Sequence, residues 1–356
     1  MPPVHVPWVS VAELAAGSAG LLPELDEDGQ VTDPLVVVEV DGQAPAALLE
    51  RAAERAGDSG RILVGIASGP LPARARPLLA ALDLTLAAAG DGRECVTVPD
   101  PQGQARLLAA AAAGSPQASL VLRQVLRMTA VLPAGAGLEA ESLAYSALLG
   151  GGEFRRWRGA RGPRPLPPAA GEPVLVHRDG PLLLVTLNHA ERRNAYSRRL
   201  RDALADALRV ALLDPTVERV VLAGAGSCFC SGGDLDEFGR APDPVTAHFV
   251  RTQAGAGPLL RMLGGRVEAR VHGACVGAGV ELAAFAGTVT AAPDATFWLP
   301  EIGMGLIPGA GGTVSVPGRI GRWRTMYLAL SGQPVDAATA LAWGLVDRVA
   351  GPASLA

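Results

Sequence analysis

The sequence predicts an α/β fold built in two halves, and two kinds of pattern support this prediction. Short apolar runs of strand length alternate with helical spacing, which favours parallel strands joined by crossover helices. In the second half these runs occupy residues 182–187, 220–223, 269–272, 289–292 and 296–299. Residues 159–173 are rich in glycine and proline, a composition typical of a linker between two folded parts.

The helices of the second half carry their own boundary signals. Ser197 is a typical N-cap residue, and apolar side chains follow it with helical spacing from Leu200 to Ala211. Another helix is expected to begin at Asp336 and to end at Gly344, because acidic residues cap helix starts and glycines end helices.

The first half repeats the alternation of strands and helices. Its expected elements are two buried strands at 35–40 and 62–67 and three helices at 44–56, 74–89 and 103–113. After Pro116 the pattern becomes almost purely helical up to Arg158. This half has no glycine-rich turn followed by an acidic residue, so the sequence predicts no catalytic constellation in it.

The composition of the chain limits its partners. A length of 356 residues gives room for two hydrophobic cores, and a net charge of −4 gives no reason to expect nucleic acid as a partner. Lysine is absent and all 31 basic residues are arginine. Any phosphate must therefore be bound by guanidinium groups or by backbone amides.

The chain carries no signal for a membrane or a metal. Its first residues lack a basic region followed by an apolar run, and no apolar stretch reaches about 18 residues. We therefore expect a cytoplasmic protein without a membrane partner. The histidine spacing predicts no metal site. The cysteines are expected to be small buried side chains: Cys95, Cys228, Cys230 and Cys275.

Three glycine-rich stretches carry the residues that suit catalysis. Glu281 ends V-H-G-A-C-V-G-A-G-V-E (271–281), Glu301 lies in L-P-E-I-G-M-G-L-I-P-G-A-G-G-T (299–313), and the third stretch is C-F-C-S-G-G-D-L-D-E (228–237). Acid/base chemistry needs carboxyl groups, and a developing oxyanion needs unobstructed backbone N–H groups. Glycines allow the close backbone approach that such N–H donors require.

Two of these stretches have the form of a strand–helix junction. The N–H groups at a helix start after 277 would point outwards towards an anion or a polarised carbonyl, with Glu281 one turn further on. At the other junction Gly232 and Gly233 free the backbone, and Asp234 is expected to cap a following helix. Each junction taken alone is equally typical of an ordinary tight turn. Together they could place two N–H groups on one oxygen, as in an oxyanion hole.

Glu301 has an apolar sequence environment. It follows T-F-W-L, which includes Phe297 and Trp298, and precedes Ile302. A carboxyl group among such side chains is poorly solvated, which raises its pKa and favours a proton-donating role. The alternative is a surface glutamate at the end of a strand.

Residues from about 174 to 350 resemble the crotonase (enoyl-CoA hydratase/isomerase) superfamily. The resemblance rests on five ordered motifs at 187–195, 229–235, 272–281, 300–313 and 342–349. It implies a spiral of ββα units that binds an acyl-CoA and polarises the thioester C=O with two backbone amides. It also implies a homo-oligomer, usually a trimer or a hexamer.

The resemblance assigns a role to each motif. The oxyanion amides would be those of Gly233 and Ala278. Glu281 would orient and deprotonate the water that attacks the β-carbon, while Glu301 would hold this water and protonate the α-carbon. No metal and no cofactor are implied, since coenzyme A is part of the substrate. The implied substrate contacts are Arg193, Asn194, Ala195, Gly232, Asp234, Leu235, Gly277 and Gly309.

The function implied is hydration of a trans-2-enoyl-CoA, as in fatty-acid metabolism, because family isomerases generally keep only the second acid. The alternatives are isomerisation, thioester hydrolysis, cofactor-free oxygenation of an arylacetyl-CoA, or non-catalytic acyl-CoA binding. Ala278 departs from the usual family glycine, and its methyl group is expected to narrow the thioester slot.

In this family a helical subdomain closes the coenzyme A pocket. Residues 115–127 and 138–157 of the first half resemble the helices of that subdomain. We therefore expect three parts. Residues 1–158 would form a degenerate crotonase-like half whose helical end covers the pocket. Residues 159–173 would form the linker, and residues 174–356 the catalytic core.

Overall fold

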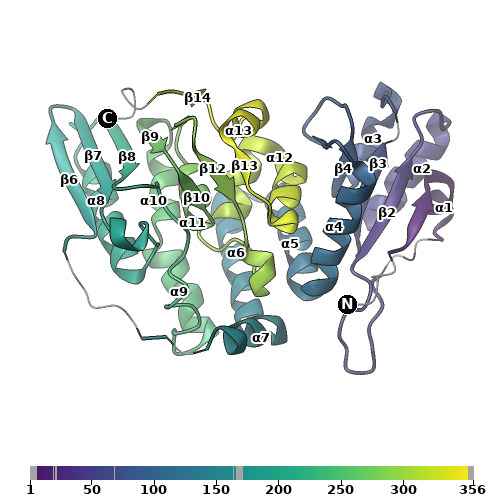
Figure 1. The fold of residues 1–356 in the computed structure, drawn as a ribbon, viewed down its shortest axis with the longest axis horizontal. Coiled ribbons are helices and arrows are strands. Elements are labelled where there is room, and N and C mark those ends of the chain that lie inside the picture. The colour runs from purple at the N-terminus through teal and green to yellow at the C-terminus, as the bar shows by residue number, and fades with distance from the viewer. Residues whose placement is uncertain are drawn as a thin grey trace.

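The computed structural model of the protein describes residues 6–18, 20, 22–67, 69–162, 164–165 and 171–351. Two sheets lie at opposite ends of the molecule, with a layer of helices between them (Figure 1). The α/β class predicted from the sequence is confirmed. Among the described residues, no helix is both long and apolar enough to cross a membrane.

The first half contains a parallel five-stranded sheet. Its strands follow in the order β1-β2-β3-β4-β5, and β2 and β3 have the bounds expected from the sequence. The strands are β1 (Trp8–Ser10), β2 (Leu35–Val40), β3 (Ile62–Ala67), β4 (Leu84–Ala87) and β5 (Cys95–Thr97). Three helices accompany the sheet: α1 (Val11–Ala16), α2 (Ala46–Asp58) and α3 (Arg76–Ala81).

The two faces of this sheet enter different cores because strand side chains alternate. Val36 and Val38 pack in one core with Leu49 of α2. Leu35 and Val37 face the opposite way, into a core that continues through the second half. The first half is therefore joined to the second by a shared apolar interior.

The predicted helix over 74–89 is wrong in its second part. Helix α3 ends at Ala81, and residues 84–87 form β4. Leu78, Leu82 and Leu86 recur every four residues, a spacing that also fits a helix. Residues 84–87 form a strand because they are buried along their whole length and pair with β3 and β5.

Four consecutive helices follow this sheet, in agreement with the helical structure predicted for 103–113 and from Pro116 to Arg158. Helix α5 packs against α12 and helix α6 against α9, and both α5 and α6 lie in the middle of the molecule (Figure 1). The helices are α4 (Pro101–Gly114), α5 (Pro116–Thr129), α6 (Ala134–Leu149) and α7 (Gly152–Arg161). The first residues of the expected linker are thus helical, and Pro163 and 166–170 lie outside the described residues.

The second half contains a six-stranded sheet in the order β14-β11-β9-β8-β7-β6, parallel except for the β6–β7 pair. Its strands are β6 (Val174–Asp179), β7 (Leu182–Leu187), β8 (Arg219–Gly224), β9 (Val267–Val271), β11 (Thr288–Ala291) and β14 (Arg348–Val349). A smaller sheet joins β10 (Ala274–Val276), β12 (Thr296–Trp298) and β13 (Val335–Asp336).

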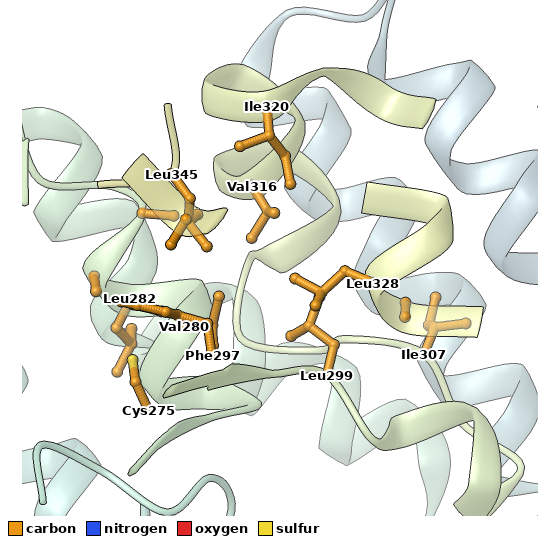
Figure 2. Close-up of a cluster of buried hydrophobic side chains, with 14 of the residues drawn as sticks. Cys275, Val280, Leu282, Phe297, Leu299, Ile307, Val316, Ile320, Leu328 and Leu345 are labelled. Atoms are coloured by element: carbon orange, nitrogen blue, oxygen red, sulfur yellow. The ribbon is translucent and has the colours of Figure 1, made fainter. Parts of the chain in front are cut away.

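The helices of the second half cover these sheets. They are α8 (Arg198–Leu213), α9 (Pro244–Ala254), α10 (Ala256–Leu263), α11 (Ala278–Ala283), α12 (Gly312–Ser331) and α13 (Ala337–Trp343). The expected caps Ser197 and Asp336 both accept from helix N–H groups. Figure 2 shows Val280 and Leu282 of α11 in the core around Phe297. Helix α11 is therefore fixed by packing on both sides of the residue between them, Glu281.

Candidate active site

The glycine-rich motifs, distant in sequence, are brought together by backbone hydrogen bonds. Tyr196 N–H donates to Gly232 O at 2.7 Å. Val276 N–H donates to Cys230 O at 2.9 Å, and Gly277 N–H donates to Trp298 O at 2.8 Å. The segments around 194, 232, 277 and 300 therefore form one site, which lies beyond the carboxyl ends of β7, β8 and β9.

Glu281 is held by a turn that lies far from it in sequence. It is the fourth residue of α11, all of whose residues are buried, and its side chain is 2% exposed. Its Oε2 accepts from Ala310 N–H at 2.6 Å and from Gly312 N–H at 2.8 Å. Two backbone donors on one oxygen favour the ionised carboxylate.

Glu301 lies beside the start of α11 with one oxygen unbonded. It opens a short 3-10 helix (Glu301–Met304) and is 8% exposed. Its Oε2 is buried and has no hydrogen-bond partner. Gly277 has φ +48, and a Cβ there would lie 2.5 Å from Glu301 Oε1. The conformation and the close contact both require glycine at 277.

Burial raises the pKa of both carboxyl groups. Burial raises the pKa of Glu301 to about 8. The pKa of Glu281 is also well above its ordinary value because of burial and the nearby Glu141 and Glu301 carboxyls, although its two backbone donors lower it. The two carboxyls differ in their hydrogen bonds: Glu281 has two backbone donors that favour a charge, whereas Glu301 Oε2 has none.

A third buried glutamate, which the sequence did not indicate, comes from the first half. Glu141 of α6 is 2% exposed. Its Oε1 accepts from Gly311 N–H at 2.7 Å, and its Oε2 accepts from Thr313 N–H and Thr313 Oγ1, both at 2.7 Å. Burial raises the pKa of Glu141 to about 7. The only sequence signal was the resemblance of 138–157 to the family's closing helices, which identified the segment and not the residue.

The two expected oxyanion donors lie at neighbouring junctions. Gly233 and Tyr196 form an isolated bridge whose bonds use Gly232 O and Asp234 N, which leaves the Gly233 N–H out of it. Ala278 is the first residue of α11, where an N–H has no acceptor within the helix. A Cβ at Gly277 would lie 3.7 Å from Gly232 Cα, so the two junctions are in contact.

Two expected substrate residues build the turn before Ser197. Arg193 and Asn194 both have φ +53, and Ala195 beside them is buried. The Asn194 side chain is fully buried and makes three internal bonds: it accepts from His189 N–H and donates to two carbonyls. Both N–H donors of its amide are used within the protein, so the side chain fixes the turn, whereas Arg193 is exposed.

Asp234 does not begin a helix, contrary to the expectation. Residues 235–239 form turns, and the Asp234 carboxylate accepts from Arg192 at 2.7 Å and from Asp236 N–H at 3.1 Å. Leu235, next in the chain, lines a cavity of about 250 Å³ together with Arg158, Arg161 and Arg240.

Gly309 packs against the first half. A Cβ at this position would collide with the ring of Tyr145 on α6, and the guanidinium carbon of Arg251 on α9 lies over the same ring, 4.6 Å from its centroid. Helix α6 thus contacts the loop that follows Glu301 and leads to the residues whose N–H groups donate to Glu281. Within the described part of the chain, His, Cys, Asp and Glu side chains form no group able to hold a metal ion.

The α/β fold, with glycine-rich turns around two buried carboxyl groups, defines a crotonase-like protein. A family model described as enoyl-CoA hydratase/isomerase matches residues 178–356. The chain belongs to the enoyl-CoA hydratase/isomerase family. The model does not cover the first half.

Curated relatives carry different reactions in their names. The chain is 35% identical over 176 residues to 2,3-dehydroadipyl-CoA hydratase of Escherichia coli (strain K12), covering 49% of this chain and 68% of that protein. It is 35% identical over 191 residues to 1,2-epoxyphenylacetyl-CoA isomerase of the same strain, covering 51% and 71%. The solved enoyl-CoA hydratase of Thermoplasma volcanium GSS1 is 32% identical, covers 52% of this chain and 74% of its own, and aligns with a TM-score of 0.48.

The raised carboxyl pKa values predict an unusual dependence of stability on pH. Folded Glu141 and Glu301 keep protons up to about pH 7 and about pH 8, whereas the unfolded chain releases them near the ordinary value of 4.5. The free energy of unfolding should therefore fall as the pH rises from about 5 to about 8, by at most about 1.4 kcal/mol per pH unit for each proton. Urea unfolding at several pH values measures this. A free energy that rises over this window would contradict the prediction, and Glu301→Gln should flatten the decline.

Proposed function

We propose that the protein catalyses the reversible addition of water across the double bond of a trans-2-enoyl-CoA. The observation that carries this proposal is the unequal bonding of two neighbouring buried carboxyls. Glu281 accepts two backbone N–H groups, while Glu301 has an oxygen without a donor. A pair with one ionised and one protonated member can remove a proton and supply another in one site.

In the proposed reaction a water molecule lies between the two carboxyl groups. Glu281 accepts a proton from the water as the water oxygen bonds to the β-carbon. The electron pair of the double bond moves towards the thioester carbonyl, whose oxygen gains negative charge. Glu301 then gives its proton to the α-carbon. The proton now on Glu281 passes to Glu301, which restores the starting state, and the reverse sequence removes water.

The backbone N–H groups of Gly233 and Ala278 are proposed to stabilise the thioester oxygen. The bridge at Gly233 and the helix start at Ala278 leave these N–H groups without the acceptors that such elements otherwise supply. Removing one donor from an oxyanion hole costs about 3 kcal/mol of transition-state stabilisation. The reaction needs no cofactor beyond the coenzyme A of the substrate.

The phosphates of coenzyme A are proposed to bind arginine, since the chain has no lysine. The cavity beside Leu235 offers Arg158 and Arg161 of α7 and Arg240. Arg161 already pairs with Asp236 at 2.8 Å, so part of the charge is neutralised within the protein. A planar guanidinium binds phosphate in a bidentate manner, which a lysine cannot do.

Incubation with crotonyl-CoA tests the proposal. We expect loss of the enoyl-thioester ultraviolet absorbance and formation of 3-hydroxybutyryl-CoA, identified by mass spectrometry. A double variant, Glu281→Gln with Glu301→Gln, provides the control for contaminating hydratase. Unchanged absorbance across a series of acyl chains would reject hydration. Free CoA would then identify a hydrolase, and a shifted double bond without added water an isomerase.

A further inference from the structure

The turn at residues 310–313 divides its backbone donors between two glutamates. Ala310 and Gly312 donate to Glu281, whereas Gly311 and Thr313 donate to Glu141. The alternation is strict over four successive N–H groups. Glu281 belongs to the second half and Glu141 to helix α6 of the first half. One turn thus couples a carboxyl of the proposed catalytic pair to a carboxyl from the other half of the molecule.

Close packing leaves this turn little freedom to compensate for a lost bond. Gly311 has φ +105, and a Cβ there would lie 2.5 Å from the ring of Phe285. A Cβ at Gly312 would lie 2.6 Å from Glu281 Cγ. The turn therefore has glycine where Phe285 and Glu281 touch it, and Glu141 supplies acceptors for the other two N–H groups.

We propose that Glu141 is a positioning residue of the active site, which by accepting the Gly311 and Thr313 donors keeps the Ala310 and Gly312 donors on Glu281. This inference rests on the proposed function for its kinetic consequence only. The first half then completes the site with a specific carboxyl group as well as with packed helices. Glu141 acts through the turn and does not touch the substrate.

The charged and titratable groups around Glu141 determine the sign of its effect. Tyr145 lies on its own helix, Arg251 on α9, Glu281 on α11 and Glu301 before α12. The Glu141 carboxyl raises the pKa of both Glu281 and Glu301. Removing the Glu141 charge should therefore lower the pKa of both carboxyls, while a freed turn should weaken the donation to Glu281 and so raise the pKa of Glu281 alone.

The experiment compares Glu141→Gln with Glu139→Gln. Glutamine keeps the size of the side chain. Its NH2 group, however, can only donate, so it cannot accept a hydrogen bond from an N–H or O–H group of the turn as the carboxylate oxygen does. Glu139 is an exposed glutamate two positions away on the same helix. For Glu141→Gln we expect kcat with crotonyl-CoA to fall by about 10- to 100-fold, since small misplacements of catalytic groups have effects of this order. KM should change little, and Glu139→Gln should match the wild type.

A second readout does not require catalysis. NMR titration of isotope-labelled glutamate carboxyls, assigned with Glu281→Gln and Glu301→Gln, follows the pair directly. Only Glu281 loses backbone donors when the turn is freed, so in Glu141→Gln a Glu281 midpoint that rises, or that falls less than the Glu301 midpoint, supports the inference, whether or not the wild type hydrates crotonyl-CoA. Midpoints that stay unchanged or fall equally would overturn it, even if kcat fell through partial unfolding. An inactive wild type in which the Glu281 midpoint responds in this way would reject the proposed reaction and keep the role of Glu141.

Discussion

Replacing Glu301 with glutamine should lower kcat for hydration of crotonyl-CoA by about 10²- to 10⁴-fold, the range that general acid–base groups contribute. Glutamine has nearly the shape of glutamate, but its amide cannot deliver a proton to carbon. The KM should stay within a few-fold, because the uncharged amide still fits beside Gly277. Steady-state kinetics on purified protein measure both constants.

A matched control separates this loss from the general effect of removing a buried carboxylate. Glu268 is 9% exposed, close to the 8% of Glu301, but it lies near the start of β9, away from the 272–277 turn. It pairs with Arg219 at 2.7 Å and Arg348 at 3.3 Å. Glu268→Gln should keep a nearly normal kcat. If Glu301→Gln also retained more than about a third of wild-type kcat, Glu301 would not be the acid.

The candidate site was predictable where its requirements are local. Gly277 must be glycine for its φ and for the approach of Glu301, and Glu281 follows one helical turn later. Such requirements can be recognised as a sequence pattern within a dozen residues. Glu141 leaves none, because its acceptors meet a turn about 170 residues further along the chain. Only the folded structure brings that side chain to the site.

Prediction of the fold failed where tertiary contacts override a local period. Residues 182–187 formed β7 as expected, because a continuous apolar run suits a buried strand. Residues 84–87 continued the four-residue spacing of α3, yet they pair with β3 and β5. Strands β13 and β14 have two residues each, too few for any period to be recognised. Asp234, expected at a helix start, binds Arg192 instead.

Replacing Asp83 with alanine should destabilise the protein by about 3–5 kcal/mol, as expected when one partner of a buried ionic network is removed. Asp83 is 2% exposed and accepts from Leu63 N–H, Arg123 Nε and Arg127 Nε, each at 2.9 Å. Arg322 Nη1 of α12 also lies 3.5 Å from Asp83 Oδ1. The variant would leave three guanidinium groups close together without the buried carboxylate that offsets their charge. Chemical denaturation followed by tryptophan fluorescence measures the loss.

The same variant tests whether the two halves unfold together. Arg322 and its neighbour Trp323 both donate to Leu82 O, next to Asp83, and the helix that carries them begins in the turn that binds Glu281. Loss of Asp83 should therefore lower one common transition, with the active site lost at the same denaturant concentration. Asp58→Ala, an exposed aspartate of α2, should shift stability by no more than about 0.5 kcal/mol. Two separate transitions in Asp83→Ala, with only the first displaced, would mean that the second half folds without this contact.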